Sequence, residues 1–427
     1  MSSKTMTTAK KEDATPALVP KLRFAEFRDA EGWSEVALSD VATIVMGSSP
    51  KSECYNQSEI GLPLLQGNAD IKNRLSAPRI FTSEITKECT IGDILLTVRA
   101  PVGSVAKSIH HACIGRGIAA VRADQPNDQE FIYQWLLSYE SRWAAVSQGG
   151  TFDAVNSDDL KGVNLTVPKP PEQRKIAEFL SSVDELMAAQ ARKVDALKTH
   201  KKGLMQQLFP CEGETQPRLR FREFQNVGDW EATTLGQQAK LVRGPFGGSL
   251  KKEIFVASGY AVYEQQHAIY SDFSSFRYHI TAEKFYELRR FVVAAGDIIM
   301  SCSGTMGRFA IVPDGAVPGV INQALLKLTP NGFCSTKFLK EVLELPSVQE
   351  KLLSQSAGGA IKNVVSVDQI KALPLRLPGA EEQRAVVGCV SSLDDLIAAE
   401  TQKLDAFKTH KKGLMQQLFP SPEAVEV

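Results

Sequence analysis

The sequence lacks the features that mark secreted or membrane-bound proteins. It has seven cysteines, at least 24 residues apart, and no C-x-x-C pair, which excludes zinc knuckles and dithiol redox motifs. Their odd number and wide spacing indicate reduced thiols in the cytoplasm. No apolar run approaches the roughly 18 residues of a membrane span. Residues 1–19 are polar and have no apolar signal-peptide core, so we expect a disordered leader.

Motifs of common catalytic and nucleotide-binding sites are also absent. There is no G-x-G-x-x-G, no Walker A loop, and no NPP[FY] or DPPY of adenine methyltransferases. The fragment GRG (115–117) is interpreted as a turn, and HH (110–111) as a polar loop pair. The run SSPK (48–51) fits S-x-x-K, but nothing else for that chemistry follows. The sequence therefore predicts no catalysis, no bound cofactor and no metal in this chain.

Charge is balanced, with 49 basic and 49 acidic residues. This excludes a generally basic nucleic-acid coat, although a local basic face remains compatible with it. The 427 residues, 43% hydrophobic and 23% charged, are ordinary for a globular protein and predict two or three domains.

An internal repeat dominates what the sequence does contain. The thirteen residues KTHKKGLMQQLFP occur at 198–210 and again at 408–420. Upstream, PPEQRKIAEFLSSVDEL resembles AEEQRAVVGCVSSLDDL, and PKLRFAEFRDAEGW (20–33) resembles PRLRFREFQNVGDW (217–230). Between these ends, only short matches such as GDILL (92–96) and GDIIM (296–300) persist. One unit was duplicated, and its middle then diverged.

Each copy is predicted to be a globular part followed by a long helix. The globular parts mix short β-rich runs with turn signals and one helix near 128–145, which indicates an α+β fold. The predicted segments are a leader (1–19), a first globular domain (20–168), a first helix (169–210), a second globular domain (211–378), a second helix (379–420) and a tail (421–427).

The two long helices share an apolar seam with alternating steps of three and four residues, typical of coiled coils. Polar residues interrupt the seams at matching steps, Gln190 and Lys201 in one helix and Glu400 and Lys411 in the other. The seam residues are Ile176, Leu180, Val183, Met187, Val194, Leu197, Leu204 and Leu208, and Val386, Val390, Leu393, Ile397, Leu404, Phe407, Leu414 and Leu418.

Matching seams favour pairing of the helices with each other over two ordinary amphipathic faces. If the termini of the second globular domain lie close together, as domain termini often do, the helices are antiparallel. We then expect the globular domains at opposite ends of the helix pair, related by a pseudo-two-fold axis.

This layout resembles the specificity (S) subunit of type I restriction–modification systems. The resemblance rests on the paired LRFAEF…W and LRFREF…W openings, the EQR-headed helices and the twin KTHKKGLMQQLFP, and it covers residues 20–420. It implies two target recognition domains that each read one half of an interrupted, asymmetric site in double-stranded DNA. It also implies that the helices act as a spacer, that two methyltransferase subunits dock on this chain and that restriction subunits join them. Methyl transfer from S-adenosylmethionine to adenine N6 would belong to these partners.

Candidate DNA contacts lie in polar loops that follow predicted strands. Arginine and lysine suit guanine, asparagine and glutamine suit adenine, and hydroxyls or backbone N–H groups suit phosphate. In the first domain the candidates are Ser48, Ser49, Lys51, Gln66, Asn68, Lys72, Arg74, Arg99, Gly149, Gly150 and Thr151. In the second they are Arg243, Ser249, Lys251, Lys252, Gln265, His267, Ser303 and Thr305. The alternative for each is a solvated loop residue.

Two rival functions remain at this point. A non-catalytic scaffold would use the two globular domains to bind proteins, whereas a single-chain restriction enzyme would need nuclease and methyltransferase regions that 427 residues leave no room for. Diverged domains on nearly unchanged helices favour a DNA-specificity subunit, because a change of target explains a change of domain.

Overall fold

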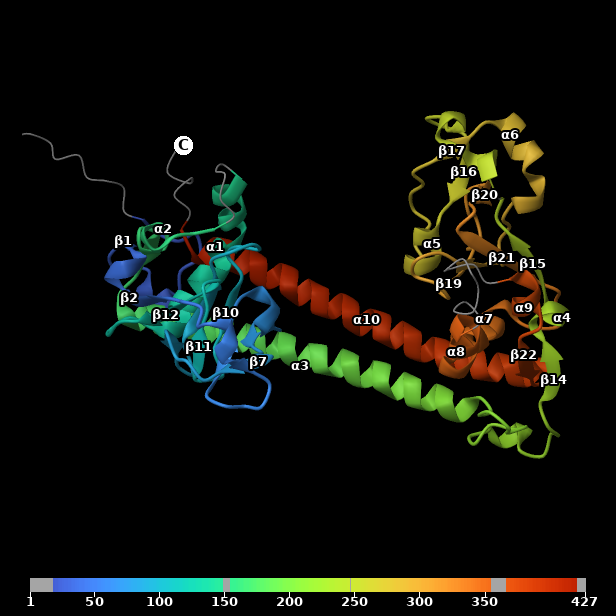
Figure 1. The fold of residues 1–427 in the computed structure, drawn as a ribbon, viewed down its shortest axis with the longest axis horizontal. Coiled ribbons are helices and arrows are strands. Elements are labelled where there is room, and N and C mark those ends of the chain that lie inside the picture. Colours follow the sequence, from blue (N-terminus) through green and yellow to red (C-terminus); the bar gives the residue numbers. More distant parts are fainter. Residues whose placement is uncertain (1–17, 149–153, 246, 355–365, 421–427) are drawn as a thin grey trace, which may run out of the picture. The chain divides into compact units, whose positions relative to one another are not determined.

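The computed structural model describes residues 18–148, 154–245, 247–354 and 366–420. The predicted leader up to residue 17, the candidates Gly149, Gly150 and Thr151, and the tail from 421 lie outside the described residues. The chain divides into two compact units, residues 1–191 with 402–427 (unit 1) and residues 192–401 (unit 2). Each unit contains one globular part and about half of each long helix, α3 (Pro170–Leu208) and α10 (Ala380–Leu418) (Figure 1).

Unit 1 is built on two larger sheets and one small one. Their strand orders are β2-β12-β9-β10-β6-β5, β3-β7-β4-β11-β8 and β1-β13. The strands are β1 (Ser34–Ala37), β2 (Ala42–Met46), β3 (Tyr55–Asn56), β4 (Leu62–Leu65), β5 (Ile71–Lys72), β6 (Leu75–Ser76), β7 (Ile80–Thr82), β8 (Glu88–Cys89), β9 (Ile94–Thr97), β10 (Val105–Lys107), β11 (Ala112–Ile114), β12 (Ile118–Ala123) and β13 (Asn164–Val167). The helices of the globular part are α1 (Gln129–Gln148) and α2 (Ser157–Lys161), with 3-10 turns η1 (Ala25–Phe27), η2 (Leu38–Asp40), η3 (Ser52–Cys54) and η4 (Asn68–Asp70).

Unit 2 has the sheet orders β15-β21-β18-β19, β17-β16-β20 and β14-β22. Its strands are β14 (Glu231–Thr234), β15 (Ala239–Arg243), β16 (Tyr260–Tyr263), β17 (His279–Ile280), β18 (Ile298–Ser301), β19 (Phe309–Ile311), β20 (Gly319–Ile321), β21 (Leu325–Pro330) and β22 (Pro374–Leu377). Its helices are α4 (Leu235–Gln238), α5 (Gln265–Tyr270), α6 (Ala282–Glu287), α7 (Thr336–Glu344), α8 (Pro346–Ser354) and α9 (Val367–Lys371), with 3-10 turns η5 (Arg222–Phe224), η6 (Gly247–Leu250), η7 (Lys252–Ile254) and η8 (Arg289–Phe291).

The two globular parts share a backbone frame despite their divergent sequences. The antiparallel order β2-β12-β9-β10 recurs as β15-β21-β18-β19, and the parallel pair β4·β11 recurs as β16·β20. The predicted helix near 128–145 is confirmed as α1, whereas its counterpart in unit 2 is divided between α7 and α8, where Pro346 begins α8. The prediction of a mixed α and β fold with an internal repeat is confirmed.

In unit 1, a buried ion pair fixes the opening motif to the start of α3. Arg23 donates from Nε and Nη2 to the Glu172 carboxylate at 2.8 and 2.7 Å, and the indole nitrogen of Trp33 donates to it at 3.3 Å. The side chains of Arg23 and Glu172 are only 6% and 3% exposed. The motifs at the two ends of a repeat are thus partners in one contact.

Unit 2 repeats this contact at equivalent positions. Arg220 donates to the Glu382 carboxylate at 2.8 and 2.7 Å, and Trp230 donates to it at 3.2 Å. The arginine and glutamate side chains are again 6% and 3% exposed. A buried charge pair breaks at high cost when one partner is removed, which accounts for the retention of LRF…W and EQR in both copies.

The repeated LFP ending places a phenylalanine in the core of each unit. Phe419 packs edge-on against Trp33 and Phe131, with ring centroids 6.4 and 5.7 Å apart. Phe209 occupies the same place in unit 2, with centroids 5.9 Å from Trp230 and 5.4 Å from Phe338. Each long helix therefore ends in the core of a globular part.

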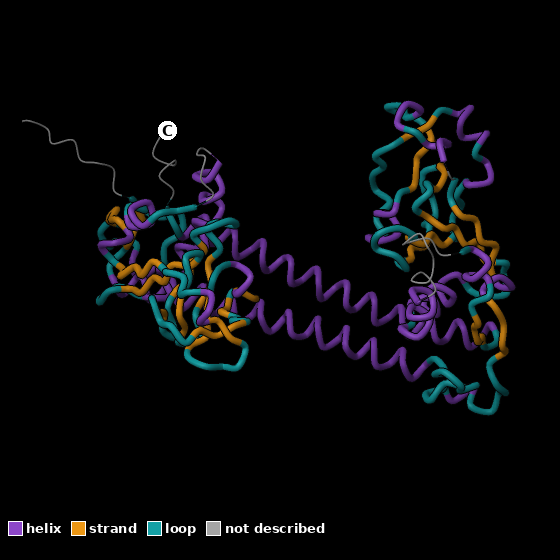
Figure 2. Tube along the Cα trace, viewed as in Figure 1, coloured by secondary structure: helices purple, strands orange, loops and turns teal. Residues whose placement is uncertain are grey.

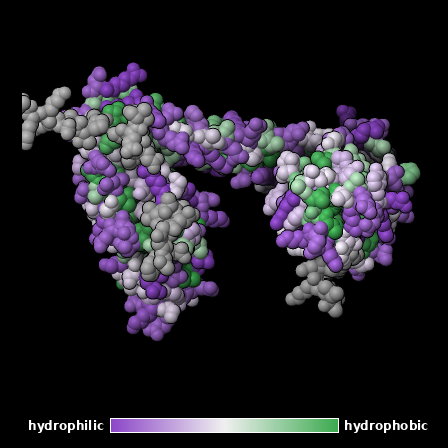
Figure 3. Space-filling model, turned by 90° about the horizontal axis from the view of Figure 1, so that it is seen from above, coloured by the Kyte–Doolittle hydropathy of each residue, from purple (hydrophilic) through white to green (hydrophobic). Residues whose placement is uncertain are grey.

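Within each unit the long helices pack side by side and run antiparallel (Figures 1 and 2). In unit 1, Ile176 and Leu180 near the start of α3 share a core with Leu418 at the end of α10. In unit 2, Leu208 at the end of α3 shares a core with Val386 near the start of α10. All sixteen predicted seam residues are buried or half-buried, so the predicted pairing of the helices is confirmed. The exposed surface of the helices is mostly hydrophilic (Figure 3).

The two lysines that interrupt the seam form ion pairs between the helices. Lys411 contacts the Asp184 carboxylate at 2.6 and 2.7 Å in unit 1, and Lys201 contacts Asp394 at 2.7 Å in unit 2. The two pairs join positions related by the repeat, because Asp394 and Lys411 each follow their counterpart by 210 residues. Polar contacts at defined seam positions favour one register of paired helices.

Candidate nucleic-acid interface

A hydroxyl-closed turn follows the central strand of the main sheet in both units. In unit 1, Thr97 Oγ1 donates to the Pro101 carbonyl and accepts from the Ser104 amide, both at 2.8 Å. In unit 2, Ser301 Oγ donates to the Thr305 carbonyl at 2.6 Å and accepts from the Arg308 amide at 3.0 Å. These turns present Arg99 in one unit and Ser303 in the other, at equivalent exposed positions.

A second shared feature is the glycine that ends the outer strand of the main sheet. A Cβ atom on Gly47 would lie 2.2 Å from the Gly115 carbonyl oxygen, and one on Gly244 would lie 1.8 Å from the Asn322 carbonyl oxygen. Neither position can hold a side chain without moving the backbone. The strand end is thereby held against the turn before β12 or β21.

In unit 1, these turns bring several polar side chains together. Ser49 Oγ accepts hydrogen bonds from the backbone N and Nε of Arg116 at 3.1 and 3.3 Å. A Cβ on Gly117 would lie 2.2 Å from the Gln66 carbonyl oxygen, and Gly117 accepts from the Val98 amide, the neighbour of Arg99. Two exposed arginines, Arg99 and Arg116, therefore lie beside Ser49 and Gln66.

Unit 2 has different residues at the equivalent positions of these turns. The Cys302 amide donates to the Ala324 carbonyl at 2.8 Å, which sets exposed Ser303 beside exposed Gln323. The Gln265 amide nitrogen lies 3.7 Å from where a Cβ on Gly304 would be. Arg243, the last residue of β15, directly precedes the tightly held glycine. Its Nε and Nη1 atoms are buried and have no hydrogen-bond partner among the described residues.

Lysines occupy one equivalent position in both units. Lys51 precedes η3 and Lys251 precedes η7, and both are exposed. The Lys51 ammonium lies 3.9 Å from Glu53, with side chains 73% and 77% exposed, so this pair is weak. The predicted residues Ser48, Asn68, Lys72, Lys252 and Thr305 are exposed, and Ser249 is half-buried.

Two predicted residues are engaged elsewhere in the structure. Arg74 forms an ion pair with Glu140 of α1 and donates to the Val105 carbonyl at 3.0 Å. His267 is 1% exposed, its Nδ1 accepts a hydrogen bond from the Glu264 amide at 2.8 Å, and its Nε2 bonds to the Ser275 carbonyl oxygen at 3.1 Å. Since both nitrogens of His267 have partners inside the unit, this side chain belongs to the core of unit 2.

No group of three metal-ligating side chains occurs in the part of the chain that the structure describes. Burial raises the pKa of the Cys302 thiol to about 11 and that of Cys334 to about 12, which makes both poor nucleophiles at neutral pH. His110 forms a hydrogen bond with Ser76, and His111 forms one with Glu88. The two neighbouring histidines therefore have different partners.

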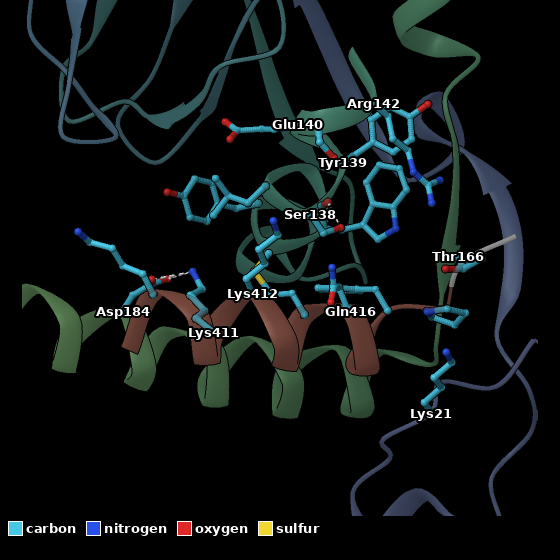
Figure 4. A pocket seen from close by; sticks show the side chains of 18 of the residues that line it. Lys21, Ser138, Tyr139, Glu140, Arg142, Thr166, Asp184, Lys411, Lys412 and Gln416 are labelled. Atoms are coloured by element: carbon cyan, nitrogen blue, oxygen red, sulfur yellow. Dashed lines mark hydrogen bonds and ion pairs between the residues drawn. The ribbon is translucent and has the colours of Figure 1, made fainter. Parts of the chain in front are cut away.

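A cavity of about 760 Å³ lies in unit 1 between α1 and the end of α10 (Figure 4). Trp135 and Tyr139 stack on its α1 side with ring centroids 5.0 Å apart. Six basic residues against three acidic ones line it, namely Lys21, Arg74, Arg142, Lys408, Lys411 and Lys412 against Glu35, Glu140 and Asp184. The cavity is a basic recess beside the repeated helix ending.

The sequence did not single out Arg116 or Gln323. Arg116 was interpreted only as part of a turn, and that turn lies beside the predicted Ser49 and Gln66. A signal was present, because ACIGRGIAAVRA (112–123) aligns without gaps to GVINQALLKLTP (319–330) and pairs Arg116 with Gln323. This alignment becomes recognisable only once the strand pairing of the two units is known.

Comparison with known proteins agrees with the repeated architecture. A family model described as the type I restriction modification DNA specificity domain matches residues 30–199 and 227–408. The putative type I restriction enzyme MjaX specificity subunit of Methanocaldococcus jannaschii is 33% identical over 182 residues, which cover 42% of this chain and 43% of that protein. The MjaVIII specificity subunit of the same organism is 23% identical over 92% of this chain and 93% of that protein.

A solved structure agrees on the fold. The type I restriction–modification S subunit from M. genitalium superposes with a TM-score of 0.55 at 18% identity, covering 94% of this chain and 99% of that one. None of the described helices is both long enough and apolar enough to span a membrane. Because the family model matches both repeats and more than half of the chain, this protein belongs to the family of non-catalytic DNA specificity subunits of type I restriction–modification systems.

Proposed function

We propose that this chain selects the DNA site of a type I restriction–modification complex, with each globular part reading one half of an interrupted, asymmetric sequence. One observation carries the proposal. The two units share their turns and strand ends but present different polar side chains there, Arg99 and Arg116 in unit 1 against Ser303 and Gln323 in unit 2. Side chains determine which bases are read, so a common frame with exchanged side chains suits two different half-sites.

The paired helices would set the gap between the half-sites. Their register is held by the Lys201–Asp394 and Lys411–Asp184 pairs and by a largely apolar seam. A specific bipartite site needs a fixed spacing between its readers, in the way that dimeric DNA-binding proteins match their half-site separation. A spacer with a single register meets this need.

The same helices would dock two methyltransferase subunits, one at each copy of the repeated ending. Core packing explains the buried identical residues of KTHKKGLMQQLFP, but not the exposed ones. The exposed identical residues are Lys198, Thr199, His200, Lys202, Gln206 and Gln207, with Lys408, Thr409, His410, Lys412, Gln416 and Gln417. A surface that occurs twice in one chain suits two molecules of one partner. In unit 1, the basic cavity adjoins the second occurrence of this surface and would extend it.

Methyl transfer would take place in these partners, which would bind S-adenosylmethionine, and restriction subunits would join the full complex. We also place the protein in the cytoplasm, because all seven cysteines are free thiols.

A methylation map tests the DNA proposal. The chain is expressed with its methyltransferase subunit in a host without DNA methylation, and modified adenines are located by sequencing. We expect a bipartite motif with a fixed unspecified gap, and exchange of residues 34–168 for those of a relative should change only one half of it. An assembled complex that modifies no such motif would contradict DNA reading and leave a protein-binding scaffold as the better account.

Docking is tested by charge reversal on the repeated surface. We expect Lys202→Glu or Lys412→Glu alone to remove one methyltransferase subunit, and the double variant to remove both, as measured by the mass of the purified complex. Arg192→Glu is the matched control, because it changes an exposed cation on α3 where the second copy has Gln402. Retention of both subunits by the double variant would rule out this surface.

A further inference from the structure

We propose that Arg243 reads a guanine in the half-site of unit 2, an inference that rests on the function proposed above. The residue ends β15, directly before Gly244 and close to the turns that carry Ser303 and Gln323. It therefore lies in the candidate interface described above. It differs from the other polar residues there because two of its buried nitrogens have no hydrogen-bond partner among the described residues.

The guanidinium of Arg243 lacks acceptors inside the chain. Its Nε and Nη1 atoms are shielded from solvent, and no hydrogen-bond partner is present for either among the described residues. Charged donors that lose water without gaining an acceptor are costly, and buried polar groups in folded proteins are nearly always paired. Arg243 as a whole is only half-buried, so a change of its rotamer can turn these unpaired donors outward to an acceptor from outside the chain.

The surroundings supply no compensating anion. The buried Cys302 thiol is close enough for the charge of Arg243 to act on its pKa. Burial has the larger effect and raises this pKa to about 11, so the sulfur remains a neutral thiol at neutral pH. Arg243 takes part in no ion pair with the described residues, whereas the buried Arg220 of the same unit is paired with Glu382.

The geometry of the group restricts what the acceptor can be. A guanidinium offers parallel N–H donors in one plane, which match the O6 and N7 acceptors of guanine in the major groove or two oxygens of a phosphate. The unit 1 residue at the equivalent position is Met46, which has no donor. A phosphate contact would be useful in both half-sites, as the shared pair Lys51 and Lys251 suggests, whereas a base contact is needed in only one. The exchange of Met46 for Arg243 therefore favours a base.

Methylation mapping of the assembled complex tests this assignment, with Arg243→Met, Arg243→Lys and the wild-type chain compared. Methionine is the unit 1 residue at this position, so the variant should fold, and thermal unfolding checks this. Lys240→Met is the control, because it removes an exposed cation from the same strand. Binding is then measured on synthetic duplexes of the mapped site in which each guanine of the unit 2 half is replaced by 7-deazaguanine, which lacks the N7 acceptor.

We expect one guanine position of a single half-site to become degenerate in Arg243→Met, and the affinity for the wild-type site to fall about 5- to 160-fold. Wild type should lose affinity when that guanine carries the 7-deaza change, and Arg243→Met should lose nothing further. Arg243→Lys should also lose discrimination at that position, because an ammonium cannot form the bidentate contact.

Three results would overturn the assignment. The unit 2 half-site could contain no guanine, Arg243→Met could keep the full motif and affinity, or affinity could fall equally on all sequences with a reduced salt dependence, which indicates a phosphate contact. Failure of the underlying function is distinguishable from these, because the wild-type complex would then modify no bipartite motif at all.

Discussion

The two globular parts agree in backbone and disagree in the side chains that the backbone presents. Both close a turn through a hydroxyl, Thr97 or Ser301, and both hold a glycine against the neighbouring turn. The side chains displayed there have been exchanged, while Lys51 and Lys251 remain the same. The shared features indicate a common physical constraint on the backbone. Under the proposed function, the shared lysines would contact phosphates, which all DNA has in common, and the exchanged residues would contact bases.

A second difference lies beside the helix pair. Buried Gln134 of unit 1 donates to Asp184 and Glu130 at 2.8 and 3.1 Å. The residue at the equivalent place in unit 2 is Glu341, 3.8 Å from Lys201 and 9% exposed. Burial raises the pKa of Glu341, and its Oε2 atom has no hydrogen-bond partner among the described residues. Each of these side chains thus keeps one buried oxygen without a hydrogen-bond partner among the described residues, Gln134 Oε1 in unit 1 and Glu341 Oε2 in unit 2, but only unit 2 places an ionisable carboxyl there.

The largest effect is expected where the units are alike. Glu172→Ala leaves Arg23 buried without its carboxylate, and Glu382→Ala does the same to Arg220. Each variant should destabilise its own unit by about 3–5 kcal/mol, the cost of breaking a buried ion pair. Hydrogen exchange of the full chain should show protection lost in the matching unit, with exposed Glu178→Ala as the control. Unchanged protection in both variants would mean that the pair does not hold the motif to the helix.

The repeat, the antiparallel helices and the mixed fold were predictable because they depend on sequence periodicity and on exact copies such as KTHKKGLMQQLFP. The pairing of Arg23 with Glu172 was not, because the partners are 149 residues apart and each motif is only locally visible. His267 was predicted at the interface from its residue type, whereas packing against Phe273 and Phe276 places it in the core. Composition identifies polar residues, but burial decides which of them are available.

The next effect should separate the units at the helix junction. Gln134→Glu removes two donated hydrogen bonds and adds a carboxylate beside Asp184 and Glu130, so unit 1 should lose about 1–3 kcal/mol. Glu341→Gln should instead stabilise unit 2 by up to about 1 kcal/mol at neutral pH. Thermal unfolding of the full chain measures both, and a loss of stability in Glu341→Gln would show that its charge is needed by Lys201.

The raised pKa of Glu341 gives this comparison a pH dependence. The folded state holds the proton at a higher pH than the unfolded state does, so this group's contribution to stability falls as pH rises from the ordinary glutamate value through the raised one. Unfolding followed from about pH 4 to pH 8 should show a shallower decline in Glu341→Gln than in wild type. Equal slopes would indicate that Glu341 titrates normally.

The exposed arginines of unit 1 test whether the two units contact DNA through different side chains. Arg99→Ala or Arg116→Ala should weaken specific binding by about 1–3 kcal/mol if the side chain contacts a base edge. Ser303→Ala at the position equivalent to Arg99 should cost about 0.5–1.5 kcal/mol, since it removes one neutral hydrogen bond. Gel-shift titration of the assembled complex measures these losses, and unchanged affinity removes the residue from the interface.

The smallest effect is expected where both units carry the same cation. Lys51→Ala and Lys251→Ala should each reduce the slope of log affinity against log salt by about 1 and leave the methylated motif unchanged, because a phosphate contact is independent of sequence. Lys240→Ala, which removes an exposed lysine of β15 that is not among the candidate DNA contacts, is the control. The two variants should match each other. A change of salt slope in only one variant, or a change of motif in either, would show that the shared lysines are not common phosphate contacts. The assignment of shared residues to phosphates and of exchanged residues to bases would then be wrong.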